Sequence, residues 1–337
     1  MDKSKNNKKD FGISLLRIIL SFMVVVDHLG DHKINNKYKN ILYYHIPTFF
    51  LISFYYTAKK LVSVDINKIK LRFKRLIFPY FVWNIISFIL NIIYHYYFNR
   101  KCPYRIYDLL IGLLSGRVFI LALWFQNVLI FTTLISTIII LLFKSNYLLI
   151  FQLLMILSYR FQYSGENYKF FKKHYENIYS LTYGRFIDTF PCSMTGIFIA
   201  SFKIKNKLDS YKFRCIFLCI LFLIFSSKYN FDSNLLTFRY GGLRLNIASC
   251  CIFFLFLLSF ESIKNNKIKK IIDILSKYTA GIYFIHLLVG KSYIIKFVLV
   301  KKINIFFRCI DIYIISYIIC FLLDKIFGNT IFGHLIK

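Results

Sequence analysis

The first apolar segment of the chain contains an arginine and a histidine, Arg17 and His28, that are eleven positions apart. An α-helix turns about 100° and rises about 1.5 Å per residue, so the two side chains lie within about 20° of one face and roughly 16 Å apart. A guanidinium can bind an anion, and an imidazole can take up a proton near neutral pH. The alternative is an arginine that snorkels to one membrane interface and a histidine at the other. Asp27 precedes His28 and either orients a neighbouring group or marks the end of the helix.

Positive charges gather immediately before the third apolar segment. Five cations stand within eight positions: Lys68, Lys70, Arg72, Lys74 and Arg75. Arginine can hold a phosphate with two parallel hydrogen bonds, so Arg72 and Arg75, together with Lys74, are candidates for binding the phosphates of a nucleotide-bearing cofactor. The excess of cations in the cytoplasmic links of membrane proteins would produce such a cluster without any cofactor.

Four other polar or amphipathic side chains in apolar segments are candidates of a weaker kind. A charge inside a membrane is costly, so Arg185 and Arg244 are expected to face a polar cavity within the protein and not lipid. Trp124 joins these two arginines as a structural or acceptor-side candidate. His286 lies toward the end of a late apolar segment, where a lone histidine is more often structural, and it is kept as a catalytic candidate.

These residues must be positioned by helices that cross a membrane. The chain is 58% hydrophobic and 20% aromatic, which is too much apolar surface for a soluble core of 337 residues. Apolar runs of roughly 18 to 22 residues recur along it, and a helix of that length crosses a bilayer. We therefore predict an all-α, polytopic transmembrane bundle of about ten helices. The predicted spans are 11–30, 41–58, 77–98, 119–142, 147–161, 184–202, 213–227, 241–260, 274–295 and 305–325.

The distribution of charge suggests how this bundle is oriented. The formal net charge of +30 is spread over the short links and forms no single stripe, which argues against a nucleic-acid partner. An even number of spans puts both termini on one side, and the basic links on that side make it cytoplasmic. We expect a basic tail over residues 1–10, then a single membrane domain over 11–326, in the inner (plasma) membrane. The cysteines form no zinc or disulfide pattern, so no metal is expected.

Five short motifs, in this order and spacing, resemble the acyltransferase-three family of bacterial integral-membrane acyltransferases that modify cell-surface glycans. They are the Arg17 and His28 pair, Ile46 to Ser53, Arg72 to Tyr80, Leu123 to Phe125, and Gly281 to His286. The chain departs from the family pattern at Phe54, where a glycine is usual, and at Ser14, where an acidic residue is common. It also lacks the Ser-x-Glu-Glu element that one large subgroup has after the Leu-Trp-Phe motif.

The resemblance implies transfer of an acyl group from cytoplasmic acyl-CoA, most simply acetyl-CoA, to a hydroxyl of a cell-surface glycan or its lipid-linked precursor. The arginines at 17, 72 and 75, with Lys74, would hold the phosphates of CoA. Neutral His28 would act as general base on the hydroxyl, because imidazole titrates near working pH. Asp27 and His286 would complete the catalytic group, and no metal is required.

A polytopic polysaccharide exporter or polymerase is the alternative function. Its cavity would also contain arginines and histidines, but it needs no cofactor-binding cluster. A polymerase more usually carries a large external loop, whereas the longest one expected here runs only from Tyr163 to Tyr183. The sequence favours the acyltransferase; it does not distinguish acetyl from succinyl, nor one glycan acceptor from another.

Overall fold

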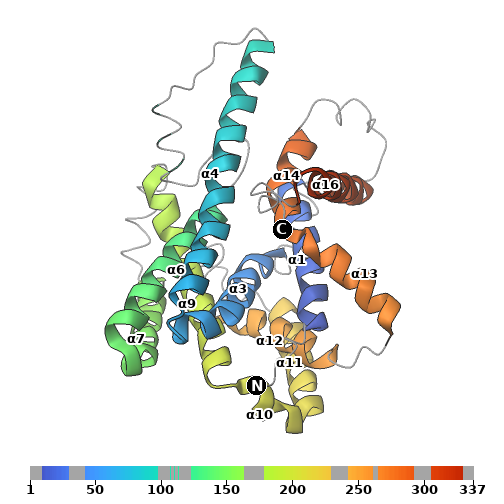
Figure 1. Cartoon of the computed structure of the whole chain (residues 1–337). Coiled ribbons are helices and arrows are strands. Elements are labelled where there is room, and N and C mark those ends of the chain that lie inside the picture. The colour runs from blue at the N-terminus through green and yellow to red at the C-terminus, as the bar shows by residue number, and fades with distance from the viewer. Residues whose placement is uncertain are drawn as a thin grey trace, which may run out of the picture.

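The computed structural model describes residues 10–29, 42–97, 107, 110, 113, 123–162, 178–228, 242–260, 265–291 and 305–328. Within these ranges the regular structure is entirely helical, which confirms the all-α prediction (Figure 1). The α-helices are α1 (Phe11–Leu29), α3 (His45–Val62), α4 (Ile66–Tyr97), α6 (Trp124–Phe143), α7 (Tyr147–Gln162), α9 (Ile178–Ser201), α10 (Ile204–Leu208), α11 (Lys212–Lys228), α12 (Leu243–Ser259), α13 (Asn266–Lys277), α14 (Thr279–Lys291) and α16 (Ile305–Phe327). Two short 3-10 turns, Lys144–Asn146 and Asp209–Tyr211, precede α7 and α11.

Helix α1 shows why these segments are helical and how they pack. Its buried side chains Ile13, Leu16, Leu20 and Val24 recur every three or four positions, which is the spacing of one helix face. That face lies against helices from the second half of the chain, because α1 contacts α12, α13, α14 and α16 as well as α3. At Gly12 any side chain would collide with the backbone carbonyl of Phe256, so the start of α1 and the end of α12 touch directly.

Helices α3 and α9 form the most extensive helix pair of the described structure. A side chain at Gly196 of α9 would meet the carbonyl of Leu51, so the two backbones approach each other at this glycine. Around them Phe50, Phe54 and Phe151 are fully buried in one apolar core. This pairing fixes α3, which carries residues of the candidate site.

Fewer helices than predicted pass a test of length and apolarity for crossing a membrane. Among the described residues four stretches pass: Phe11–His28, Ile66–Tyr97, Trp124–Gln162 and Phe306–Phe327. The bent pair of α13 and α14 would make a fifth. Each of the ten predicted segments does coincide with a described helix. The rest miss the criterion for physical reasons: α11 and α12 have 17 residues each, and α3 and α9 include charged and hydroxyl-bearing side chains.

Two predicted boundaries are wrong. Helix α4 begins at Ile66, so the basic cluster lies in its first turns and not in a link before residue 77. The predicted span 274–295 is interrupted, because α13 ends at Lys277 and α14 leaves it at an angle of 53°. The lysine-rich segment is helical because Asn265 caps it, accepting hydrogen bonds from the backbone nitrogens of Lys267 and Ile268.

Parts of the sequence analysis concern segments outside the described residues. These are positions 1–9 of the basic tail and positions 163–177 of the polar loop. The orientation of the termini and the single-domain organisation stay predictions. The described helices are apolar enough to fit a membrane protein.

Candidate active site

The structure brings two predicted catalytic residues together across 258 positions of sequence. The rings of His28, at the end of α1, and His286, on α14, have their centroids 5.4 Å apart and their planes at 33°. His286 is buried, with 1% of its surface exposed, and its Nδ1 lies 2.9 Å from the carbonyl oxygen of Ile282. Because a carbonyl only accepts, Nδ1 carries the proton, and Nε2 is the basic nitrogen of the neutral ring. His286 is thus held by its own helix in one tautomer beside His28.

A third histidine, which the sequence analysis missed, lies beside the third predicted catalytic residue. His45, the first residue of α3, has no exposed surface, and its Nε2 is 4.0 Å from Oδ2 of Asp27. Its Nδ1 contacts the backbone carbonyl of Leu42. The sequence contains a signal for His45, because an ionisable residue inside a predicted membrane span is a candidate functional residue, as His28 is. The structure therefore places the carboxylate of Asp27 next to a second ionisable group, and its role stays a prediction.

Apolar side chains from the helices of His28 and His286, and from α4, form a buried cluster. Trp83 of α4 stacks on Phe284 of α14, with ring centroids 5.8 Å apart and planes at 19°. Both rings belong to one buried cluster with Val25 and Val26 of α1 and Leu42. An apolar environment strengthens the interactions of polar groups inside it.

Two of the three predicted donor-binding arginines, Arg17 and Arg72, donate to a hydroxyl on another helix. Arg17 donates through Nη2 to Oγ1 of Thr279, at 2.9 Å, and that hydroxyl donates in turn to the carbonyl of Ser276 at 3.1 Å. Arg72 donates through Nη2 to Oγ of Ser53 on α3. Both arginines are partly exposed. A guanidinium has five N–H donors, so one hydroxyl fixes its direction without using its capacity to bind an anion.

Further cations surround Arg72. Burial, followed by the charges of Arg72, Arg75 and Lys68, lowers the pKa of Lys60 near the end of α3. Burial is the larger cause, and the contributions of Arg72, Arg75 and Lys68 indicate that these cations lie close to Lys60. Arg75 and Lys74 are exposed, and Lys74 lies about 200° round the helix from Arg72, so it points away from this group. The structure thus gathers Lys60 with Arg72 and Arg75 but not Lys74.

The distance from Arg17 to His28 along α1 is similar to the distance from Ser53, the partner of Arg72, to His45 along α3. Helices α1 and α3 are in contact, and the Asp27 and His45 pair joins the end of one to the start of the other. Ser53, which holds Arg72, is eight positions beyond His45, or about 12 Å along α3. On α1, Arg17 is roughly 16 Å from His28. Two anion-binding groups therefore stand on the same side of the imidazoles.

Two of the remaining candidates, Arg185 and Trp124, are connected to His286 by aromatic contacts. Arg185 of α9 lies over the ring of Trp124, with Cζ 3.9 Å from the ring centroid. The next residue, Phe125, packs on Tyr283 at 5.2 Å, and Tyr283 packs on His286 at 6.2 Å. A continuous run of aromatic contacts thus connects Arg185 to the catalytic candidates.

Arg244 is placed in the first turn of α12, which meets the end of α7 and the middle of α9. The backbone nitrogen of Gly242 donates to Oε1 of Gln162 at 2.8 Å, and Asn246 donates to the hydroxyl of Tyr159. Gln162 also donates to the carbonyl of Ile187. Arg244 therefore lies in a helix turn whose neighbouring polar groups bind one another, and its place in a polar interior stays a prediction.

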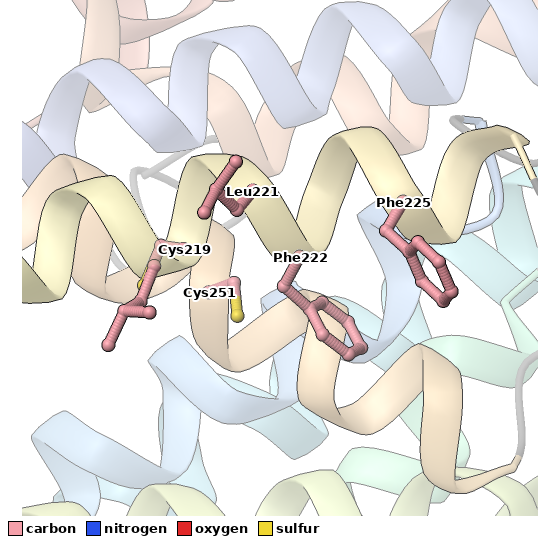
Figure 2. A pocket seen from close by; sticks show the side chains of 6 residues that line it. Cys219, Leu221, Phe222, Phe225 and Cys251 are labelled. Carbon is pink, nitrogen blue, oxygen red and sulfur yellow. The ribbon is translucent and has the colours of Figure 1, made fainter.

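Two hollows in the described structure are separate from this site. One, of about 600 Å³, lies between α11 and α12. Figure 2 shows its lining, in which Phe222 and Phe225 come from α11 and Cys251 from α12. The other, of about 290 Å³, is lined mainly by aliphatic and phenylalanine side chains of α6, α7 and α9. Neither hollow is lined by a candidate residue, so the candidate active site is defined by the contacts between its side chains and not by a cavity.

Comparison with known proteins identifies the family. No curated protein and no solved structure matches the chain. The family model described as an acyltransferase domain (Acyl_transf_3) matches residues 10–333, which is essentially the whole chain. The match includes every helix that carries a candidate residue. The protein therefore belongs to the acyltransferase-three family.

Proposed function

We propose that this membrane acyltransferase moves an acyl group, most simply acetyl, from cytoplasmic acyl-CoA to a hydroxyl of a cell-surface glycan or its lipid-linked precursor. The single observation that carries the proposal is the apposition of His28 and His286 at 5.4 Å, with Arg17 on the same helix as His28. We place the protein in the inner membrane with about ten spans and both termini in the cytoplasm. Family membership supports the general activity, acyl transfer.

The donor binds at the arginines. The phosphates of acyl-CoA contact Arg17, Arg72 and Arg75, and Lys60 adds to the positive potential there. The pantetheine arm is thin enough to pass between helices, and the spacing of about 12 to 16 Å along α1 and α3 brings its thioester toward the imidazoles. The hydroxyls of Thr279 and Ser53 keep the two guanidinium groups oriented before the donor arrives.

The reaction takes place at His28. Its neutral ring accepts the proton of the acceptor hydroxyl while that oxygen attacks the carbonyl carbon of the thioester. The carbon–sulfur bond breaks, and the CoA sulfur leaves as a thiolate and takes a proton. The carboxylate of Asp27 stabilises the imidazolium that forms next to it. His286, held in one tautomer by Ile282, fixes the position of the His28 ring.

His45 acts through Asp27 and is a positioning residue. Its Nε2 faces the carboxylate, and its Nδ1 is held at the carbonyl of Leu42. The pair joins α1 to α3 at the depth of the reacting groups. The acceptor side of the site is formed by Trp124, Arg185 and the first turn of α12, which holds Arg244.

The test is a transfer assay in membranes that contain the protein. Radiolabelled acetyl-CoA is added, and release of free CoA is measured together with label in host glycans. Arg17→Ala and His28→Ala are compared with Arg214→Ala, which changes an exposed arginine on α11, and with His95→Ala, near the end of α4. Label that requires Arg17 and His28 but neither control residue supports the proposal. Folded wild-type protein that transfers neither acetyl nor succinyl would point to a glycan exporter or polymerase.

A further inference from the structure

Helix α13 carries two kinds of exposed side chain that the acyl-transfer site does not use. Ile268, Ile271 and Ile274 are 46%, 56% and 44% exposed. Lysines at 267, 270 and 277 are exposed as well. Only Ile272 and Ser276 are buried. Large aliphatic groups and cations thus share one short helix on the surface.

The helical positions separate these side chains into two sides. At about 100° per residue, Ile268 and Ile271 lie about 40° and 100° to one side of the buried Ile272. Lys270 and Lys277 lie about 160° and 140° to its other side. On the isoleucine side Lys267 lies at about 140° and Ile274 at about 160°, and on the lysine side Asp273 lies at about 100°. One side of the helix is therefore mainly apolar and the other mainly cationic, and the two meet at Lys267 and Ile274, opposite the buried Ile272. This is the pattern of a helix that lies between a protein, lipid tails and lipid headgroups.

The position of α13 agrees with that pattern. It leaves α14 at 53°, and the two helices together are apolar enough to count as a broken membrane span. In Figure 1 the orange α13 runs obliquely away from α14. The ammonium group of Lys269 lies 5.3 Å from the ring centroid of Phe11, the first residue of α1. Helix α13 therefore extends to the level at which the first apolar helix begins.

The joint between α13 and α14 is held by other helices. Tyr278 donates to Asp324 of α16 at 2.7 Å, and Lys277 pairs with the same carboxylate. Thr279, the next residue, accepts from Arg17 of α1. Contacts with two helices thus set the direction in which α13 leaves the bundle.

We propose that α13 lies in the headgroup region of the membrane and binds anionic lipid. Ile268 and Ile271 enter the boundary with the acyl chains, and the lysines at 267 and 270 contact the anionic headgroups. The charge of the helix favours anionic lipid, because it contains four lysines and one aspartate. The occupant of the apolar face is lipid because the same short helix combines exposed isoleucines with a net positive charge, which is the combination that binds at a membrane surface.

The first experiment measures depth in the full-length protein in nanodiscs. Ile271→Trp and Lys270→Trp are prepared, and the fluorescence quenched by acyl-brominated lipid is compared with that of the wild type, which supplies the background of its native tryptophans. We expect the new tryptophan at 271 to be quenched at least about twofold more than that at 270, since the two positions differ by about 100° round the helix. Equal weak quenching with emission typical of water would overturn the proposal. Blue-shifted but unquenched emission at 271 would do so too, because it would show a protein or second copy on this face.

The second experiment tests the choice of lipid. The melting temperature is measured in phosphatidylcholine nanodiscs with and without phosphatidylglycerol. The stabilisation by anionic lipid is expected to fall by about half or more in Lys267→Gln/Lys270→Gln, which removes two cations near the surface. The matched variant Lys207→Gln/Lys212→Gln, in the segment from α10 to α11, should retain it. Equal losses in both variants, or none in either, would reject a specific lipid contact of α13.

Discussion

The arginine and histidine regions of this protein both involve α1 and α3, but Arg72 comes from α4 and His286 from α14, and the two regions differ in burial. Arg17 and Arg72 are partly exposed, and each donates to a hydroxyl of a neighbouring helix. His45 and His286 are fully buried, and each has its Nδ1 against a backbone carbonyl. A site that binds a large anion must stay open to it, whereas groups that transfer a proton must be held in one tautomer away from water. His28, the proposed base, is partly exposed like the arginines and lies beside the buried His286. The contrast fits the proposal that the donor binds at the arginines and reacts at the histidines.

The largest effect is expected from His28→Ala. Loss of the general base should lower the rate of acyl transfer by about 10²- to 10⁴-fold, with little change in donor binding. The rate is measured in membranes at saturating acyl-CoA, and protein abundance is checked by immunoblot. His95→Ala should keep the wild-type rate. If His28→Ala raised KM and left kcat intact, the division between the two regions would be wrong.

The arginines should show the opposite kinetic pattern. Arg72→Ala and Arg17→Ala are expected to raise KM for acyl-CoA by about 10- to 100-fold, because a hydrogen bond to a charged group contributes roughly 1.5–3 kcal/mol. Arg72→Lys should restore only part of the affinity for acyl-CoA, since a lysine does not bind a phosphate bidentately. The matched control is Arg214→Ala. If KM were unchanged in both Arg17→Ala and Arg72→Ala, acyl-CoA would not bind at these arginines.

A smaller effect is expected at His45 because it acts through Asp27. His45→Ala should lower kcat by about tenfold, in line with the loss of a buried charged contact, and leave KM for the donor unchanged. His45→Gln keeps a nitrogen that can reach Asp27, and His45→Asn keeps one that can reach Leu42. We expect Gln to restore more activity than Asn, and we expect the acidic limb of the pH–rate profile to move only in the variants that lose the Asp27 contact. Equal activity in His45→Gln and His45→Asn would show that the contact of His45 with Asp27 does not contribute to the reaction.

The smallest effect concerns Lys60 and pH. Neighbouring cations and burial lower its pKa, so it loses its charge at a lower pH than an ordinary lysine does. Above that pKa one cation is missing from the arginine region, and KM for acyl-CoA should rise by about two- to fivefold, as expected for one partly screened charge. Lys60→Met should show the higher KM already at neutral pH and no further rise as pH increases. KM for acyl-CoA is measured from neutral to alkaline pH in the wild type and in Lys60→Met. Parallel curves for the two proteins would show that Lys60 does not contribute charge to donor binding.

The sequence predicted the parts of this arrangement that depend on a single helix. The spacing of Arg17 and His28 needed only the period of α1, and the motif around His286 made that residue a candidate. Its apposition to His28 across 258 positions was not predicted. Contacts between different helices could not be predicted from the period of a single helix. The hydroxyl partners Thr279 and Ser53 come from other helices, and His45 was overlooked because it stands where an apolar segment begins. The count of about ten spans exceeded the four or five stretches that qualify by length and apolarity, because several helices mix apolar and polar faces.

The early position of α1 in the chain has a consequence for biosynthesis. Its partners are made late: Arg17 binds Thr279, which follows 262 positions later, and Ser21 binds Tyr313. At about 5–20 residues per second, a ribosome needs roughly 13 to 52 s to travel from the codon of Arg17 to that of Thr279. During that interval the guanidinium has no Thr279 to bind. A nascent chain that stops before α14 therefore contains both donor-binding arginines but only one of the two apposed histidines, and it cannot assemble the catalytic pair.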